Sequence, residues 1–359
     1  MIKKTALLLL ACLVLGAAAL AAGGSGDPLA SLSYLAGTFS DTLDRQIDRR
    51  LDASDQALLE GAADGGGAGE TAAVWAETRL KAGDALLGST GTGVLVLAGS
   101  VQVHCTTGTV VDVSAGTTVP SGATLSTGHR YLAAEDTSAV FTVTSKTAVV
   151  DYQGPYAFTY SGEVDYNAAA AALKTLHLFQ GSFTGYGQGF DLEAAPTRLQ
   201  ALIMFIRVLG EEQQALAWTG TTPFTDIQRG SQAEKYVGYA YAMGYTNGYS
   251  ATSFRPAGAV NAYQYTEFVL RAMGYSSAAN TNLADTLTRA RDCGVLTEGE
   301  VAMLQRDPFL RAELAYLSYY ALEAVLPDGG TLGERLEEKG VFTRAEWDAA
   351  RGQVPGWRL

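Results

Sequence analysis

An arginine in the first turn of a predicted helix is the residue of this sequence that most directly suggests binding chemistry. Thr197-x-x-Gln200 has the pattern of a capping box, in which the threonine hydroxyl binds the third helical amide and the glutamine reaches back. Both residues are therefore expected even in a purely structural helix. Arg198 lies between them, where a cation opposes the helix macrodipole, so helix stability does not explain it. An arginine fork suits an anionic ligand, and a salt bridge or plain solvation are the alternatives.

The region around Arg198 is rich in the residue types that recognise anions and sugars. Between residues 164 and 325 lie 13 of the 18 tyrosines and nine arginines, against two lysines. Four of the tyrosines lie along one predicted helix and its exit: Tyr236, Tyr239, Tyr241 and Tyr245. They suit either a helix-bundle core with hydroxyls at its rim or stacking on sugar rings.

Signatures of catalysis and of metal binding are missing from the sequence. It contains no G-x-S-x-G, H-E-x-x-H, C-x-x-C or Walker pattern. His104 adjoins Cys105 in a predicted strand, where consecutive side chains face opposite ways, so this pair is not expected to bind a metal. His129 and His177 have no obvious catalytic partners. We therefore expect no enzymatic activity, no metal and no cofactor.

The length and charge of the chain limit its class and partners. With 359 residues, it exceeds one typical domain, so two or three domains are expected. The formal net charge is -12, which excludes nucleic acid as a partner because phosphate backbones are bound by concentrated Lys and Arg. An anionic ligand would have to be held by a few placed arginines.

The first 22 residues read as a signal peptide. They combine Lys3 and Lys4 with an apolar run and a small-x-small cleavage site at residues 19–21. Cys12 ends a lipobox-like sequence, which makes lipidation at that residue an alternative. No later stretch is apolar for long enough to span a membrane. We expect the mature protein to be secreted.

Two further segments precede the arginine-rich region. Residues 23–70 contain an amphipathic helix, with Leu43, Ile47 and Leu51 at four-residue spacing, and a Gly-rich linker. Residues 71–163 consist of short Val- and Thr-rich runs separated by Gly-containing turns, with no helical period. This second segment predicts a small all-β barrel, sandwich or roll.

Residues 164–326 are helical and contain a sequence repeated three times. PTRLQALIMFIRVLG from Pro196 aligns without gaps to VNAYQYTEFVLRAMG from Val260, and more loosely to FLRAELAYLSYYALE from Phe309. A second helix ending in glycine precedes each copy, so three helix pairs are expected to stack. Residues 327–359 then read as a helical tail.

The middle copy resembles an S-layer homology motif. It has the F-x-D opening at residues 224–226, a helix ending in Gly244, the F-R-P loop at residues 254–256 and a second helix. The first copy resembles the motif from its first helix onward. The third is degenerate but keeps Leu310-Arg311-Ala312-Glu313 in place of the family's T-R-A-E. The resemblance covers about 160 residues of the chain and says nothing about residues 23–160.

The resemblance implies a fold, a ligand and a set of binding residues. S-layer homology motifs usually work in threes, as a pseudo-threefold helical bundle that binds secondary cell-wall polysaccharide, often through a pyruvylated sugar. A sugar-linked carboxylate requires an arginine fork and backbone donors at a helix start. The residues that match the family's binding positions are Thr197, Arg198, Asp226, Arg311 and Glu313. Asp226 also suits a turn or cap.

Departures from the family pattern reduce the number of binding sites that the sequence predicts. Leu310 replaces the threonine beside Arg311, and Asn261-Ala262 replaces Thr-Arg in the second copy, so at most two sites keep the arginine. Our first hypothesis is a non-catalytic protein anchored to the bacterial cell wall. A self-assembling structural or S-layer-associated subunit and a cell-wall polysaccharide-processing enzyme are the alternatives.

Overall fold

The computed structural model describes residues 70–181, 185–277, 282–355 and 358–359. The predicted signal peptide (1–22), the amphipathic helix with its Leu43, Ile47 and Leu51 stripe, and the Gly-rich linker lie outside these residues. Residues from Gly69 to Leu359 form one compact unit. The order of its elements, strands followed by helices, is the one that the sequence predicts.

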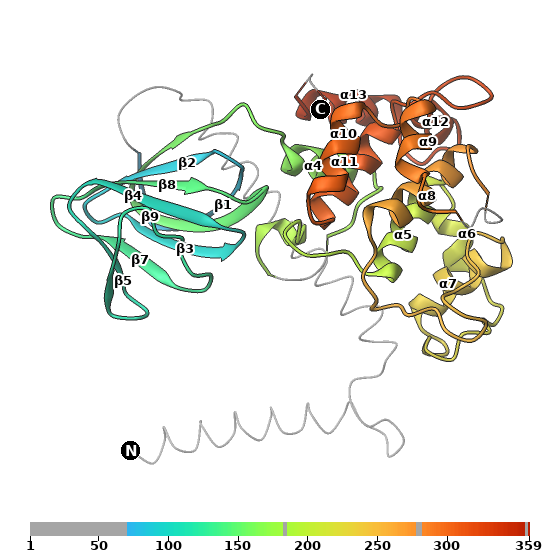
Figure 1. Ribbon diagram of the computed structural model, residues 1–359, viewed down its shortest axis with the longest axis horizontal. Helices are drawn as coiled ribbons and strands as arrows, with labels where there is room; N and C mark the ends of the chain where they lie inside the picture. Colours follow the sequence, from blue (N-terminus) through green and yellow to red (C-terminus); the bar gives the residue numbers. More distant parts are fainter. Residues whose placement is uncertain (1–69, 182–184, 278–281, 356–357) are drawn as a thin grey trace, which may run out of the picture. The chain divides into compact units, whose positions relative to one another are not determined.

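The strands form one curved antiparallel sheet, a half-barrel (Figure 1). Along the sheet the order is β4-β8-β2-β9-β3-β7-β5-β6, and β1 pairs with β9. The strands are β1 (Glu70–Lys81), β2 (Ala85–Ser89), β3 (Gly93–Ala98), β4 (Val101–Thr107), β5 (Val110–Asp112), β6 (Thr117–Val119), β7 (Arg130–Ala133), β8 (Ser138–Val143) and β9 (Thr147–Thr159).

Alternation of apolar and polar residues places one face of the sheet in a core. In β8, Ala139, Phe141 and Val143 are buried and their neighbours are not. The turn that leads into β9 lies so close to residue 99 that this position requires a glycine. Gly99 has φ +82°, and a Cβ there would lie 2.4 Å from the carbonyl oxygen of Thr147. The β8–β9 turn is thereby packed closely against the turn after β3.

The helices form a bundle with a separate apolar core (Figure 1). They are α4 (Tyr166–Thr175), η2 (Gly187–Gly189), α5 (Arg198–Val208), α6 (Glu212–Ala217), α7 (Gln232–Ala242), α8 (Ala262–Met273), α9 (Thr286–Asp292), α10 (Glu298–Arg306), α11 (Arg311–Ala321), α12 (Leu332–Glu338) and α13 (Arg344–Gln353). The predicted repeat helices are α5, α8 and α11. We call the segments from α4 to α5, from α7 to α8 and from α9 to α11 the first, second and third repeat. Helix α8 contacts both α5 and α11, so the three repeats are stacked together.

The tail packs on the bundle as the sequence predicts. Phe342 and Trp347 are buried in the helical core and their rings stack at 5.7 Å. Thr343 and Glu346 form the predicted capping box at the start of α13.

Candidate functional site

The start of α5 holds the first of the predicted binding residues. The hydroxyl of Thr197 accepts a hydrogen bond from the amide of Gln200 at 3.2 Å, and the Gln200 side chain accepts one from the Thr197 amide at 2.9 Å. The predicted capping box is therefore present, and it gives both residues a structural role.

A loop of the second repeat completes the helix start. The amide of Arg198 donates to the carbonyl of Gly258 at 2.8 Å, and that of Leu199 donates to the carbonyl of Pro256 at 3.1 Å. Because protein groups already bind these amides, they are not available to hold a ligand. A ligand at this position must be bound by side chains.

The side chain of Arg198 extends over the same loop. Its Nε donates to the carbonyl of Phe254 at 2.9 Å, and its guanidinium lies 5.1 Å from the centre of the Phe254 ring. Burial lowers the pKa of Arg198 and the neighbouring charge of Arg255 lowers it further, while Asp226 opposes both. A Cβ at Gly258 would lie 3.5 Å from both Cδ of Arg198 and Cβ of Arg255, so the two arginines lie close together.

Asp226 holds the backbone of Arg255 in place. Its carboxylate accepts hydrogen bonds from the amide of Phe254 at 2.9 Å, the amide of Arg255 at 2.7 Å and the hydroxyl of Ser253 at 2.8 Å. Burial opposes ionisation, but these donors prevail and lower the pKa of Asp226. Asp226 therefore has a structural role, but it joins two segments that are distant in the sequence and does not cap a local turn.

Arg255 is exposed and has a strained backbone. Its φ is +59°, in the left-handed region, and its guanidinium lies 3.5 Å from the centre of the Tyr249 ring, which is 58% exposed. In the described part of the chain, no carboxylate oxygen lies within 4.0 Å of a nitrogen of the Arg255 or Arg198 side chain. We call Arg198, Tyr249, Phe254 and Arg255 the α5 site.

The start of α11 repeats this backbone arrangement. The amides of Arg311 and Ala312 donate to the carbonyls of Ala194 at 2.8 Å and Leu192 at 3.1 Å. Ala194 and Leu192 occupy the same positions in the first repeat as Gly258 and Pro256 in the second, 64 residues later. Similar backbone contacts therefore join two pairs of repeats.

The side chains at α11 have different surroundings from those at α5. Arg311 is buried, with its guanidinium 5.6 Å from the Phe179 ring and Nη1 3.9 Å from Asp191. Glu313 accepts the amide of Leu310 at 2.7 Å and also binds Lys146 of the sheet. Burial raises the pKa of Glu313, while Lys146 counteracts that effect. We call Arg311, Glu313, Asp191 and Glu193 the α11 site.

The structure therefore separates the five predicted residues into two sites. Thr197, Arg198 and Asp226 lie at the α5 site or support it, whereas Arg311 and Glu313 lie at the α11 site. A cavity of about 200 Å³ lies beside Arg311, lined by residues of α5 and α11 and by residues 179–181. At the start of α8, Asn261 caps the helix and Ala262 supplies no cation, as the sequence predicts.

Sequence reasoning missed the partners of these residues. Arg255 was visible in the F-R-P loop, but only the fold places it beside Arg198. Lys146 lies far from the repeats in the sequence, and no local pattern connects it with Glu313. Among the predicted helix tyrosines, Tyr236 and Tyr239 are buried and bind Glu212 and Glu211 through their hydroxyls, as expected of a core with a polar rim.

The residues that the structure describes contain no cluster of three or more His, Cys, Asp or Glu side chains suited to a metal ion. His129 binds Asp112 at 2.7 Å, and Cys105 and Cys293 are both free thiols. No helix within the described ranges is long and apolar enough to cross a membrane.

A comparison with protein families identifies the segment that supplies Tyr249, Phe254 and Arg255 to the α5 site. Residues 223–261 match the family model of the S-layer homology domain. This segment includes Asp226, Tyr249 and the loop of Phe254 and Arg255. No curated protein matches the chain. An S-layer homology domain indicates a cell-surface protein associated with the cell wall, and this chain is an S-layer homology domain-containing protein.

Proposed function

We propose that this chain is an exported, non-catalytic protein that attaches to the bacterial cell wall by binding secondary cell-wall polysaccharide at the α5 site. The observation that carries the proposal is that Arg255, on a loop inside the matched S-layer homology segment, lies close to Arg198 at the start of α5. This pair gives the site positive charge on a chain whose formal net charge is -12.

The chemistry of the α5 site suits an acidic sugar. A carboxylate on a sugar, such as a pyruvyl ketal, accepts hydrogen bonds from guanidinium groups more strongly than a neutral hydroxyl does. Nε of Arg198 binds a carbonyl, and no hydrogen bond or ion pair among the described residues uses its terminal nitrogens, which can therefore donate to a ligand. The exposed ring of Tyr249 offers apolar contact for a sugar next to the charge.

The arrangement of the repeats supports a pseudo-threefold bundle. The backbone contacts at α5 and α11 follow one pattern, and α8 lies in contact with both helices. The equivalent position at the start of α8 differs, because it is occupied by Ala262 and not by an arginine. On this proposal the three repeats share one architecture, but the α5 site differs in pairing two arginines, of which Arg198 is half-buried and Arg255 is exposed.

Binding of the mature chain to purified sacculi tests the proposal. Wild-type protein is expected to co-sediment with intact sacculi and to stay in solution after chemical removal of the secondary polymer. Arg198→Ala is expected to weaken co-sedimentation, whereas Arg229→Ala is the control, because that arginine lies just before the second repeat and its side chain is 63% exposed.

Three outcomes would contradict the proposal. Equal sedimentation with stripped sacculi would assign binding to another wall component. Failure of folded wild-type protein to bind, together with concentration-dependent growth of its own assemblies, would favour the self-assembling subunit. Release of soluble sugars from sacculi by purified protein would show an enzyme.

A further inference from the structure

The α11 site differs from the α5 site by two acidic residues. The first and second repeats align with an offset of 64 residues, so Asp191 takes the place of Arg255 and Glu193 takes the place of Ala257. The α5 site therefore carries two arginines, while Arg311 at the α11 site lies beside two carboxylates. An anionic polymer gains little from such a site, because its negative charge meets Asp191 and Glu193.

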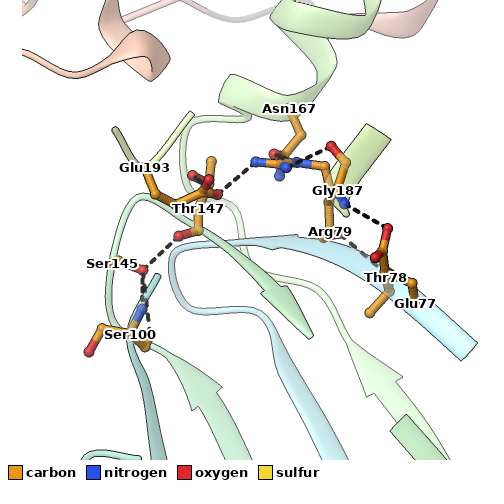
Figure 2. Close-up of polar contacts among 9 residues, drawn as sticks. All are labelled: Glu77, Thr78, Arg79, Ser100, Ser145, Thr147, Asn167, Gly187 and Glu193. Carbon is orange, nitrogen blue, oxygen red and sulfur yellow. Dashed lines mark hydrogen bonds and ion pairs between the residues drawn. The ribbon is translucent and has the colours of Figure 1, made fainter. Parts of the chain in front are cut away.

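A cation of the sheet binds one of these carboxylates. Arg79 on β1 donates from Nη2 to Glu193 at 2.6 Å, from Nη1 to the carbonyl of Gly187 at 2.9 Å and from Nε to Asn167 at 2.9 Å (Figure 2). The Arg79 side chain is 8% exposed and that of Glu193 is 14% exposed. Thr147 also donates to Glu193, at 2.7 Å. This is a desolvated, charge-assisted contact and not a surface ion pair.

The same arginine reproduces a feature of the α5 site. The guanidinium of Arg79 lies 5.6 Å from the centre of the Phe190 ring, and Phe190 is the first-repeat equivalent of Phe254. At the α5 site, the residue over that ring is Arg198 of the helix itself. The sheet thus supplies to the first repeat the arginine that α5 supplies to the second.

A second cation, Lys146 of the turn between β8 and β9, contacts Glu313 at the α11 site. Lys146 binds Glu313, which is buried, and lies 3.3 Å from Asp307. The turn is fixed by Ser145, whose hydroxyl accepts the Ser100 amide at 2.8 Å and donates to the carbonyl of Thr147 at 2.7 Å (Figure 2). Lys146 and Thr147 are therefore presented from a preorganised turn.

The backbone of η2 also contacts the sheet, at β1. The amide of Gly187 donates to the carboxylate of Glu77 at 2.7 Å, and its carbonyl accepts from Arg79. Gly187 has φ +59°, and a Cβ there would lie 2.3 Å from Nη1 of Arg79 and 2.6 Å from Cγ2 of Val149. The first repeat thus approaches β1 and β9 so closely that a side chain at residue 187 would displace Arg79 and Val149.

We propose that the α11 site is an internal docking site whose occupant is the sheet of the same chain, held by Arg79 and Lys146, and that it does not bind wall polymer. The chain then has one polymer site, at α5, and carries its sheet in a fixed orientation on the wall anchor. The second part of this inference rests on the proposed function, whereas the docking itself does not.

Amide hydrogen exchange of the mature chain tests the docking without any polymer. In the double variant Arg79→Ala, Lys146→Ala, exchange at Gly187 is expected to accelerate at least about tenfold, because its acceptor Glu77 moves away. Arg130→Ala is the control, since that arginine lies on the same sheet and stacks on Trp75. Unchanged exchange at Gly187 in the double variant would overturn the docking.

Two checks separate undocking from loss of folding. Amides of β9 such as Val150, which pairs with both β1 and β3, should remain protected in the variant. Glu193→Gln, which keeps the shape of the side chain and removes its charge, should accelerate Gly187 exchange by a smaller factor. If Val150 loses protection as well, the Glu193→Gln result alone decides, and unchanged exchange there overturns the docking.

Polymer titration by calorimetry tests the second part. Both the wild type and the Glu193→Gln variant are expected to bind one polymer repeat per chain. Two binding sites in either protein would overturn the exclusion of polymer from the α11 site. Absence of binding in both proteins would contradict the proposed function. The hydrogen-exchange test of docking would not be affected, because it uses no polymer.

Discussion

The guanidinium of Arg79 binds the carboxylate of Glu193 at 2.6 Å, and this ion pair joins the sheet to the first repeat. Only Oε1 of Glu193 takes part in described hydrogen bonds, from Arg79 and Thr147. No donor in the described part of the chain reaches its buried Oε2. Removing Arg79 would leave a buried carboxylate with little compensation, so the pair is far more sensitive to substitution than a surface salt bridge.

Alanine substitutions at two glycines of one segment distinguish an effect on docking from an effect of backbone strain. Gly187→Ala places a Cβ against Arg79 and Val149, whereas a Cβ at Gly185 would have no heavy atom within 4 Å. Both glycines have positive φ, so both alanine variants carry similar strain of about 1 kcal/mol. We expect faster proteolysis between sheet and bundle in Gly187→Ala only. Equal proteolysis of the two variants would show that strain alone is responsible.

Replacement of Asp226 tests the support of the α5 site. Asp226→Ala removes the acceptor of three hydrogen bonds and should cost about 1 to 2 kcal/mol in the free energy of unfolding measured in urea. Polymer affinity should also fall, because Arg255 loses its fixed backbone. Asp292→Ala is the control, since that aspartate is 61% exposed. Loss of stability with unchanged affinity would mean that Arg255 does not contribute to binding.

A carboxyl group in the sheet should give the protein an unusual dependence on pH. Burial, and secondarily the charge of Glu77 on the neighbouring strand, raise the pKa of Asp151 from 3.8 to about 6. Since the folded state holds this proton more tightly than the unfolded state, its contribution to stability falls as the pH rises from about 4 to 6. The full shift corresponds to about 3 kcal/mol, which solvent screening of this half-buried group reduces to about 1 kcal/mol.

Asp151→Asn removes that loss of stability. Calorimetry should show the variant melting about 2 to 4 °C above the wild type at pH 7 and no higher than the wild type at pH 4. An equal difference at both pH values would show that the effect does not come from ionisation of Asp151.

Much of the fold could be predicted from local patterns. The capping box of Thr197, the helical repeat and the anchors Phe342 and Trp347 are all present, because short-range periodicity and capping chemistry determine them. The half-barrel was predicted only as one of several small β architectures, since strand order depends on pairings between residues far apart in the sequence.

The candidate sites were predictable only in part. Matching to a motif places Arg198 and Arg311 at equivalent helix starts, and the structure gives both the same backbone contacts. Their different surroundings depend on Arg255 and on cations of the sheet, which no local pattern connects with them. Long-range contacts such as that of Arg79 with Glu193, which joins the sheet to the first repeat, also have no signal in the local sequence.

The most direct test of the central claim is the affinity of purified secondary polymer for three proteins, measured by calorimetry with folding checked by circular dichroism. The account predicts that Arg198→Ala raises Kd at least about tenfold, as loss of a charge-assisted hydrogen bond of about 1.5 to 3 kcal/mol requires. It predicts that Arg311→Gln changes Kd less than about twofold, because Arg311 is buried at the docked α11 site. Unchanged affinity in Arg198→Ala, or an equal loss in Arg311→Gln, would contradict it.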